Sequence, residues 1–344
     1  MQNRRLVGFA HCLFCLIWIC FGFRNSDFGF TAQESSPQKS RLLIAFASYR
    51  DRPKHPNIFF YEHDGVGQGK IVGTVGTPRG MASAEAHPSL SHDGRYCVFT
   101  FELENKTGQI KCWDLKEQKL IELSTINDSP NAQMAPCFSG DGNLVAFSAW
   151  NRPGGPGQGW HVFLYDLPGK KLLDLPGLNS QAFDDRAPAL SGNGRLLAFA
   201  SNRKGGAGLT DIYLYDRQDS KLLPLPDVNT KHAELEPSLS GDGSLLAFSS
   251  DRPGGQGGRD TYLFDLTAGK YLALPGLNSA AHEYSPALSP DGRYLVFVSE
   301  RVGGEGQRDI YLYDRQAQKL LPTPGLNSKA EDFDPCVIVV RAAD

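Results

Sequence analysis

A sequence unit of about 49 residues recurs along the chain, and this repeat limits the available folds more than any other feature. The unit is clearest at residues 285–327, where four short runs rich in Val, Ile, Leu, Tyr and Phe are each bounded by turn residues. Such runs predict a four-stranded antiparallel sheet whose strands follow one another in order. Tandem units of roughly 20–50 residues are typical of solenoids and propellers.

Each unit opens with a proline, and a glycine turn follows it a few residues later. Asp-Gly or Asn-Gly in this turn supplies the positive φ angles that a tight hairpin requires. Successive prolines are separated by 48, 52, 49, 49 and 49 residues. The prolines are Pro88, Pro136, Pro188, Pro237, Pro286 and Pro335.

An aspartate ends the third run of every unit, and a lysine opens the fourth run a few residues later. The aspartate can accept N–H groups of the following turn, and the lysine discourages pairing of an outer edge with another chain. Six copies of both signals define six units. The aspartates are Asp64, Asp114, Asp166, Asp216, Asp265 and Asp314, and the lysines are Lys70, Lys119, Lys171, Lys221, Lys270 and Lys319.

The two ends of the repeat array are complementary. The first unit, residues 41–76, lacks an opening strand, whereas residues 334–340 form an opening strand with no unit after it. We therefore expect the C-terminal strand to pair into the N-terminal unit as its innermost strand. The sequence predicts an all-β fold, a six-bladed β-propeller of four-stranded antiparallel blades closed in this way.

The repeated motifs carry a family resemblance. P-x-[LF]-S-x-[DN]-G-[RNS], followed by F-x-S-x-R and D-[IT]-Y-[LF]-[YF]-D, resembles the WD-repeat-like propeller repeats of the TolB family, and the resemblance covers residues 41–340. TolB is the periplasmic component of the Tol biopolymer-transport system. The α/β domain that precedes its propeller has no counterpart in the motifs found here. The resemblance therefore implies a TolB-like propeller that serves another system.

The N-terminal segment has the pattern of an export signal. Arg4 and Arg5 precede an apolar run over residues 6–23, and a polar stretch follows. We expect residues 1–32 to be a signal peptide or an N-terminal membrane anchor, residues 33–40 a linker and residues 41–344 the propeller. The propeller would then be extracytoplasmic, either periplasmic or secreted.

Composition and cysteine spacing narrow the function classes. A formal net charge of −3 provides no basic field for nucleic acid. The cysteines within the repeats, Cys97, Cys112, Cys137 and Cys336, lack the CxxC spacing of zinc or redox sites. Cys97 and Cys112 fall on neighbouring strands, where they either form a disulfide or stay buried as small apolar residues. We expect a monomer.

Carboxylates recur three residues before the opening prolines. First strands of a propeller line its central channel, so these groups should form a ring near the channel mouth. Such a ring binds Ca²⁺ or a cationic partner segment, unless each carboxylate caps backbone N–H groups of its own loop or the next blade. The carboxylates are Glu85, Asp185, Glu234, Glu283 and Asp332, with Gln133 in the remaining unit.

The same face should carry the loops between second and third strands, which are glycine-rich at residues 153–159, 204–208, 253–258 and 302–306. An arginine and an aspartate flank three of these loops, as at Arg203 and Asp211, and predict an ion pair that braces the loop. Aromatic side chains such as Trp160, Tyr284 and Phe333 would either contact a ligand or pack between blades.

Three histidines precede opening prolines and give a second functional interpretation. His87, His232 and His282 could join the nearby carboxylates in a metal site, although they lie one, five and four residues before their prolines. The sequence contains no G-x-S-x-G nucleophile motif. We therefore expect a non-catalytic envelope scaffold that binds a protein or peptide. The alternative is a metal-dependent carbohydrate-active enzyme, a lyase or hydrolase, with its site at the channel mouth.

Overall fold

The computed structural model describes residues 41–76, 83–103 and 107–340. The predicted signal or anchor (residues 1–32) and linker (residues 33–40) lie outside these ranges. Within them, no helix is long and apolar enough to cross a membrane.

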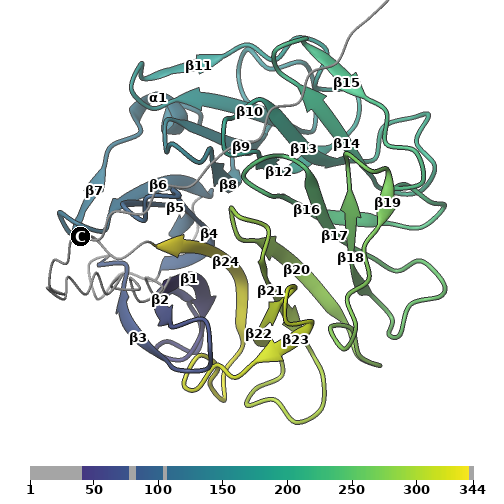
Figure 1. Cartoon of the computed structure of the whole chain (residues 1–344). Helices are drawn as coiled ribbons and strands as arrows, with labels where there is room; N and C mark the ends of the chain where they lie inside the picture. The colour runs from purple at the N-terminus through teal and green to yellow at the C-terminus, as the bar shows by residue number, and fades with distance from the viewer. Residues whose placement is uncertain (1–40, 77–82, 104–106, 341–344) are drawn as a thin grey trace, which may run out of the picture. The chain divides into compact units, whose positions relative to one another are not determined.

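Six four-stranded antiparallel sheets make up the described chain, and they form the blades of a β-propeller (Figure 1). A single helical turn, α1 (Ser124–Asn127), lies between blades 2 and 3. Blade 1 contains β24 (Asp332–Val340), β1 (Arg41–Ser48), β2 (Asn57–His63) and β3 (Gly69–Thr74). Blade 2 contains β4 (Ser83–Leu90), β5 (Tyr96–Leu103), β6 (Gln109–Asp114) and β7 (Lys119–Ile121).

The other four blades follow the chain without interruption, each running from its innermost to its outermost strand. Blade 3 contains β8 (Gln133–Phe138), β9 (Leu144–Trp150), β10 (Trp160–Asp166) and β11 (Lys171–Leu173). Blade 4 contains β12 (Asp185–Leu190), β13 (Leu196–Ser201), β14 (Asp211–Asp216) and β15 (Lys221–Leu223). Blade 5 contains β16 (Glu234–Leu239), β17 (Leu245–Ser250), β18 (Asp260–Asp265) and β19 (Lys270–Tyr271). Blade 6 contains β20 (Glu283–Leu288), β21 (Tyr294–Ser299), β22 (Asp309–Asp314) and β23 (Lys319–Leu321).

Blade 1 is assembled from both ends of the described chain, which confirms the predicted closure. β24 pairs antiparallel with β1 from Arg41 opposite Val340 to Ser48 opposite Asp332. Figure 1 shows the yellow β24 beside the purple β1. Because β24 satisfies the inner edge of β1, the ring of blades has no open sheet edge at the channel.

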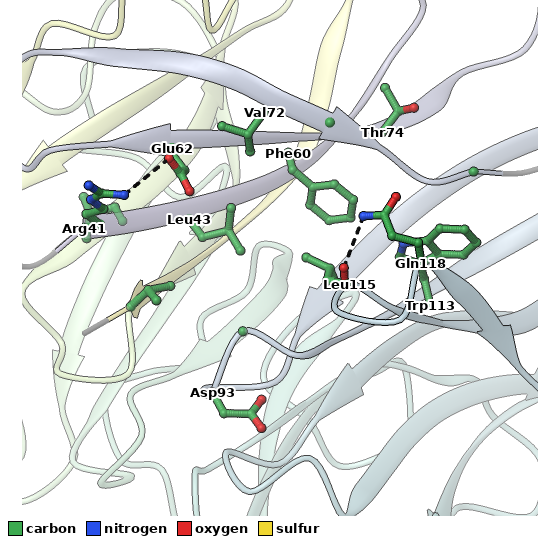
Figure 2. Close-up of a pocket in the computed structure, with 15 residues that line it drawn as sticks. Arg41, Leu43, Phe60, Glu62, Val72, Thr74, Asp93, Trp113, Leu115 and Gln118 are labelled. Carbon is green, nitrogen blue, oxygen red and sulfur yellow. Dashed lines mark hydrogen bonds and ion pairs between the residues drawn. The ribbon is translucent and has the colours of Figure 1, made fainter. Parts of the chain in front are cut away.

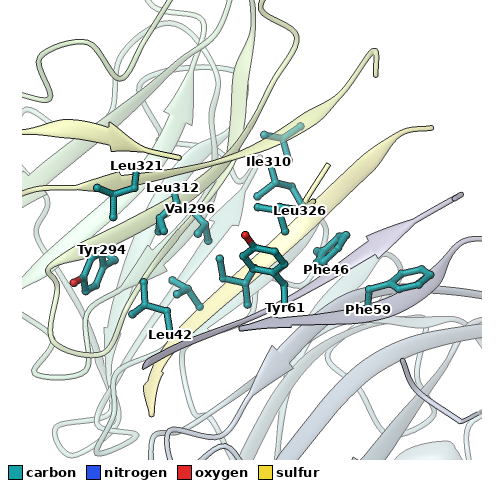
Figure 3. Packing of buried hydrophobic residues seen from close by; sticks show 13 residues of the cluster. Leu42, Phe46, Phe59, Tyr61, Tyr294, Val296, Ile310, Leu312, Leu321 and Leu326 are labelled. Atoms are coloured by element: carbon teal, nitrogen blue, oxygen red, sulfur yellow. The ribbon is translucent and has the colours of Figure 1, made fainter. Parts of the chain in front are cut away.

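The core lies between neighbouring blades rather than within any one of them. Between blades 6 and 1, Leu42, Phe46 and Tyr61 pack against Val296 and Leu312 (Figure 3). One phenylalanine in each second strand is fully buried. Since both faces of each sheet are covered, the central strands are apolar at nearly every position instead of alternating. The phenylalanines are Phe46, Phe99, Phe147, Phe199, Phe248 and Phe297.

The aspartates after the third strands bind the turns that follow them, as the sequence predicts. In blade 1, the Oδ1 atom of Asp64 accepts the N–H groups of Val66, Gly67 and Gln68, each at 2.9 Å. Partial burial would raise the pKa of Asp64, but these donors outweigh it and lower the pKa to about 2. The anionic form is therefore the one that stabilises the hairpin.

The four cysteines of the repeats are free. Cys97 lies opposite Trp113 in the β5–β6 register, whereas Cys112 lies opposite Val98, so the two thiols project from opposite faces of blade 2. A disulfide between them is excluded by this geometry. Burial raises the pKa of the Cys112 thiol to about 12, as expected for an unreactive core residue.

The two faces of the propeller differ in their loops. The glycine-loop face carries the loops that enter each first strand and the loops between second and third strands. The opposite, hairpin face carries the first-to-second and third-to-fourth strand turns. On the hairpin face, four consecutive backbone hydrogen bonds of 2.7–3.1 Å link the turns of blades 2 to 6. The donor–acceptor pairs are His92 to Gly140, Gly140 to Gly192, Gly192 to Gly241 and Gly241 to Pro290.

Glycine is required in this belt of hydrogen bonds because the turns approach one another closely. A Cβ atom on Gly192 would lie 2.7 Å from the carbonyl oxygen of Gly241. The belt ends at Pro290, which has no N–H to donate to the next blade. Blade 1 is the next in the ring. Its first two strands, β24 and β1, come from opposite ends of the described chain, so no hairpin turn connects them at this position.

Deletion of residues 333–344 should abolish stable folding. It removes nearly all of β24, including the buried Val337 and Ile338, and exposes the inner edge of β1. The expected loss is comparable to the full free energy of unfolding of an ordinary domain, roughly 5–15 kcal/mol. Thermal and urea unfolding measure it, with truncation after Val340 as the control that keeps β24 intact. Equal melting temperatures for the two truncations would contradict the role of the closing strand.

Candidate functional site

The predicted ring of carboxylates lies on the glycine-loop face, but its members are fully buried. Each side chain stands at the start of its first strand, and none has any exposed surface. Glu85, Gln133, Asp185, Glu234, Glu283 and Asp332 all occupy this position. They form a repeated element of the blade interior and do not face the channel solvent.

Each of four carboxylates caps the loop that leads into its own strand. The Oδ2 atom of Asp185 accepts the N–H of Ser180 at 2.7 Å, and Oε2 of Glu283 accepts the N–H of Ser279 at 2.9 Å. Glu234 and Asp332 do the same with Thr230 and Ser328. This arrangement matches the capping alternative. Cation binding by these residues stays a prediction, which calorimetric titration with calcium would test.

The same carboxylates are paired with arginines, and three of these arginines were predicted to pair instead with the aspartates across the glycine-rich loops. Arg203 contacts Asp185 at 2.6 Å, and Arg252 contacts Glu234 at 3.0 Å. Arg301 pairs with Glu283 and Arg50 with Asp332. The predicted ion pair between Arg203 and Asp211 was therefore wrong. The guanidinium instead turns inward, where it also binds a serine hydroxyl of its own blade and a carbonyl of the preceding loop.

The aspartates that were expected to meet these arginines hold the glycine-rich loops through backbone contacts. Asp211 accepts the N–H groups of Ala207 and Gly208, and Asp309 accepts that of Gly306. Burial raises the pKa of both Asp211 and Asp309, and their backbone hydrogen bonds only partly offset it. The loops on this face are thus fixed at one end by a poorly solvated carboxylate.

The three candidate histidines are not brought together. His87 lies 3.6 Å from Asp334 in the neighbouring blade, and His232 and His282 occupy separate loops of blades 5 and 6. Within the described residues there is no group of three or more His, Cys, Asp or Glu side chains arranged to hold a metal ion. Their different offsets from the prolines account for this separation.

Two open depressions on the glycine-loop face share Glu236. One, of about 370 Å³, extends from Glu236 to Asp184 and Arg186. The other, of about 430 Å³, extends from Glu236 to Arg259, His282, Tyr284 and Arg308, with Asp251 and Glu300 also lining it. Both are lined by charges of either sign. The surface therefore offers paired polar contacts on both sides of Glu236 rather than a uniformly acidic ring.

Glu236 itself joins two blades. It precedes Pro237 with a φ of 55°, in a β-bulge shared by all six first strands. Its Oε2 atom accepts the Ser249 hydroxyl at 2.7 Å and the N–H of Ser285, in blade 6, also at 2.7 Å. The bulge thus turns a polar side chain across the blade boundary at the channel entrance.

A pair of tryptophans lies beside the first depression. The rings of Trp150 and Trp160 are 5.9 Å apart, and the Arg186 guanidinium lies 5.1 Å from the Trp160 ring. Trp150 is 40% exposed. Asp184 accepts the backbone N–H of Trp160 at 2.9 Å and pairs with Arg186 at 2.5 Å, so polar contacts hold Trp160 and Arg186 in place.

Sequence reasoning named Trp160 but missed Trp150. The signal was an extra residue: Phe147 and Arg152 are five positions apart in blade 3, whereas the equivalent Phe199 and Arg203 in blade 4 are four apart. The insertion places Trp150 opposite Trp160 in the β9–β10 register.

Blade 3 also loses the buried polar network of the other blades. Gln133, Ala149 and His161 form one row across β8, β9 and β10, where blade 4 has Asp185, Ser201 and Asp211. Within the described residues, the two ring nitrogens of His161 and the Oε1 atom of Gln133 are buried without a hydrogen bond. The Nδ1 atom of His161 lies 3.8 Å from the buried Asp185 of blade 4. This departure costs stability and coincides with the tryptophan pair.

The second depression has an aromatic border as well. Phe333 packs 5.5 Å from Tyr49, and the Arg308 guanidinium lies 5.1 Å from the Phe333 ring. The Tyr284 hydroxyl donates to Glu300 at 3.1 Å, and burial raises its pKa further above the ordinary value. The predicted aromatic residues therefore contact the charged groups of this face.

Comparison with known proteins identifies the fold. The described propeller is similar to TolB from Acinetobacter baumannii, with 19% identity and a TM-score of 0.60 over 88% of this chain and 67% of that one. The fold is that of the TolB propeller. Putative TolB from Agrobacterium tumefaciens gives 17% identity and a TM-score of 0.54, covering 88% of this chain and 99% of that one. No protein-family model and no curated protein sequence matches the chain.

An enzyme shares this TolB-like architecture. Oligogalacturonate lyase in complex with manganese has 14% identity and a TM-score of 0.51 over 83% of this chain and 73% of that one. At such identities the likeness concerns the fold alone, so activity has to be argued from the side chains.

Replacement of Arg203 by alanine should destabilise the chain far more than replacement of Arg195, although both belong to blade 4. R203A leaves Asp185 charged and fully buried, with an expected cost of about 3–5 kcal/mol. R195A breaks the pair with Asp216, in which Arg195 is half exposed, and should cost much less because solvent screens an exposed ion pair. Urea unfolding of both variants measures the difference. Similar midpoints would show that the buried pair is not a structural element.

Two aspartates at opposite ends of β22 should respond in opposite directions to charge removal. Folding raises the pKa of Asp309 through burial, so its charge opposes folding at neutral pH and D309N should raise the melting temperature. Burial also acts on Asp314, but Arg293 and two turn N–H groups outweigh it and lower its pKa. Its contribution is present above the unfolded pKa of about 3.9 and is lost as pH falls through the folded value.

D314N should therefore lower stability at pH 7 by about 1 kcal/mol, and the deficit should disappear in acid. Thermal melts of D309N, D314N and the parent chain across acidic to neutral pH test both signs. A D314N deficit that persists at the acid end would contradict the charge-based explanation.

Proposed function

We propose that the chain is an exported binding scaffold of the cell envelope, and that its glycine-loop face receives a protein or peptide. The observation that carries this proposal is the cluster of Trp150, Trp160 and Arg186 at the edge of an open depression. Tryptophan and arginine dominate the energetics of protein interfaces because they combine large apolar area with directed hydrogen bonds. Trp150 is exposed, whereas the phenylalanine of each second strand is fully buried.

The mixed charges around Glu236 support an extended partner. The two depressions lie on either side of this residue, with Arg186 on one side and Arg259 and Arg308 on the other. A peptide crossing the channel entrance could place acidic groups at both sides and donate backbone N–H groups to carboxylates between them. The TolB-like fold and the signal-like N-terminal sequence support a location outside the cytoplasm.

A second function, as a metal-dependent enzyme acting on acidic polysaccharide, is favoured by one observation. The manganese-bound oligogalacturonate lyase shares the propeller architecture. In this chain, the histidines and carboxylates near the channel entrance occupy separate loops or pair with arginines. Incubation of the purified chain with polygalacturonate and manganese tests the alternative, because a lyase forms unsaturated products that absorb in the ultraviolet.

Substitution of Trp150 by alanine should weaken partner binding without reducing stability. Proteins cross-linked to the full chain in envelope extracts would first be identified, and the recovered partner would then be titrated against both forms. A central interface tryptophan contributes about 2 kcal/mol or more, so the affinity should fall at least tenfold. Leu120→Ala, at an exposed position of the outer strand β7, is the matched control. Equal affinities for W150A and the parent chain would remove the glycine-loop face from the proposal.

A further inference from the structure

A cavity of about 900 Å³ opens between blades 1 and 2 on the hairpin face (Figure 2). It lies on the side of the propeller away from the glycine-loop face, so it is independent of the function proposed for that face. Its volume falls within the range of small-molecule sites, about 300–1,000 Å³. β1, β2 and β3 form one wall, and the turns and strands of blade 2 form the other.

The cavity exists because the outermost strand of blade 1 lacks a side chain that fills the corresponding space in other blades. In blades 2, 3, 4 and 6 the fourth strand places an isoleucine or a leucine opposite the third strand, and this side chain packs against the core between that blade and the next. In blade 1 the corresponding residue, opposite Phe60 of β2, is Gly73. A Cβ atom on Gly73 would meet no atom within 4 Å. The residues in the other blades are Ile121, Leu173, Leu223 and Leu321.

The floor of the cavity is apolar and partly aromatic. Leu43 and Phe60 project from blade 1 toward Leu115 and Trp113 of blade 2. Trp113 stands where blades 1, 4 and 6 have a tyrosine whose hydroxyl donates to a proline carbonyl of the preceding blade, as Tyr215 does to Pro176. Its indole N–H makes no hydrogen bond with any residue in the described ranges. The floor thus combines a flat hydrocarbon surface with one unused donor.

The rim supplies both acceptors and donors. Oδ1 of Asp93 accepts the Ser91 hydroxyl and the backbone N–H of Arg95, and the Asp93 side chain is exposed. Gln118 donates to the Leu115 carbonyl at 3.2 Å, and no donor to its own amide oxygen is found among the described residues. At the other end, Arg41 and Glu62 form an exposed pair at 4.0 Å. The rim therefore alternates carboxylate, amide and guanidinium groups around an apolar floor.

We propose that this cavity binds a neutral sugar unit. A pyranose ring has a face of C–H groups that packs on apolar and aromatic side chains, and its hydroxyl groups both donate and accept hydrogen bonds. Leu43, Phe60 and Trp113 fit that face, while Asp93, Gln118 and the Arg41–Glu62 pair fit the hydroxyl groups.

Other ligand classes fit the lining less well. An anion would meet two carboxylates, Glu62 and Asp93, against the single guanidinium of Arg41, which already pairs with Glu62. An acyl chain would leave the polar rim groups buried without partners, at a cost that neutral hydroxyl groups avoid. The charge balance and the mixed polarity of the rim thus favour an uncharged, hydroxyl-rich ligand.

Calorimetry and tryptophan fluorescence of the full chain test this site. The probes are methyl β-glucoside, N-acetylglucosamine and galactose, titrated well above the millimolar dissociation constants expected of single sugar units. Binding of at least one probe should change Trp113 emission. Gly73→Leu should fill the cavity and reduce the affinity at least tenfold, because its side chain projects from the same face as its register partner Phe60. Val302→Leu, on an exposed loop of the glycine-loop face, should bind as the parent does.

Two outcomes would overturn the proposal. One is the absence of heat and of fluorescence change with all three sugars. The other is equal sugar binding by G73L and the parent chain, which would place the site elsewhere. Octanoate is included as a competitor, and binding of octanoate without binding of any sugar would assign the cavity to an amphiphile instead. Circular dichroism of G73L establishes that the variant is folded.

Discussion

The hydrogen bonds between β24 and β1 hold the array of blades closed, and the packing of every other blade depends on this closure. Each sheet is apolar on both faces, so no blade can exclude water from its core without a neighbour on either side. In an open array the two end blades would each expose one such face. Because β24 comes from the other end of the chain, closing the first blade also brings blades 6 and 1 into contact, and the core between them includes Leu42 and Val296. The pairing of one strand therefore determines whether six interfaces exist or five.

Within this ring, the glycine-loop face is organised by charges that solvent does not reach. Arg203 neutralises Asp185 while Asp185 also caps the Ser180 N–H, so one buried pair fixes both the start of a first strand and the loop before it. The same arrangement recurs at Arg252 and Glu234. Since these carboxylates are already paired, the aromatic and charged groups left at the surface of this face are residues that the repeat does not determine, such as Trp150, Arg186 and Glu236. A buried, repeated set of ion pairs thus forms a rigid support for a variable surface.

The sequence was sufficient to predict the number of blades, the strand order and the closing strand. Each of these follows from counting turn and strand signals, which depend on residues close together in the chain. It also identified the position of the carboxylates, but not their partners. Arg203 is eight residues from Asp211 and eighteen from Asp185, and sequence proximity favoured the wrong aspartate. The choice depends on which direction the arginine side chain takes from its strand, and this follows from the buried Ser201 hydroxyl that its Nε atom binds. The disulfide between Cys97 and Cys112 fails for a related reason: adjacency of strands is visible in a sequence, whereas a one-residue offset in register places the thiols on opposite faces.

The most informative residues are those at which one blade departs from the others. A repeat in which each position serves packing gives the same residue type in every copy, and a substitution that weakens packing requires another reason to persist. Blade 3 replaces Asp185, Ser201 and Asp211 equivalents with Gln133, Ala149 and His161, loses hydrogen bonds, and presents Trp150 to solvent. Blade 1 has Gly73 where the fourth strands of other blades carry a leucine or an isoleucine, and a cavity opens there against Trp113. Both departures cost stability, and both create a surface or a cavity with aromatic and polar groups together. They lie on opposite faces of the propeller, so a ligand at one leaves the other accessible.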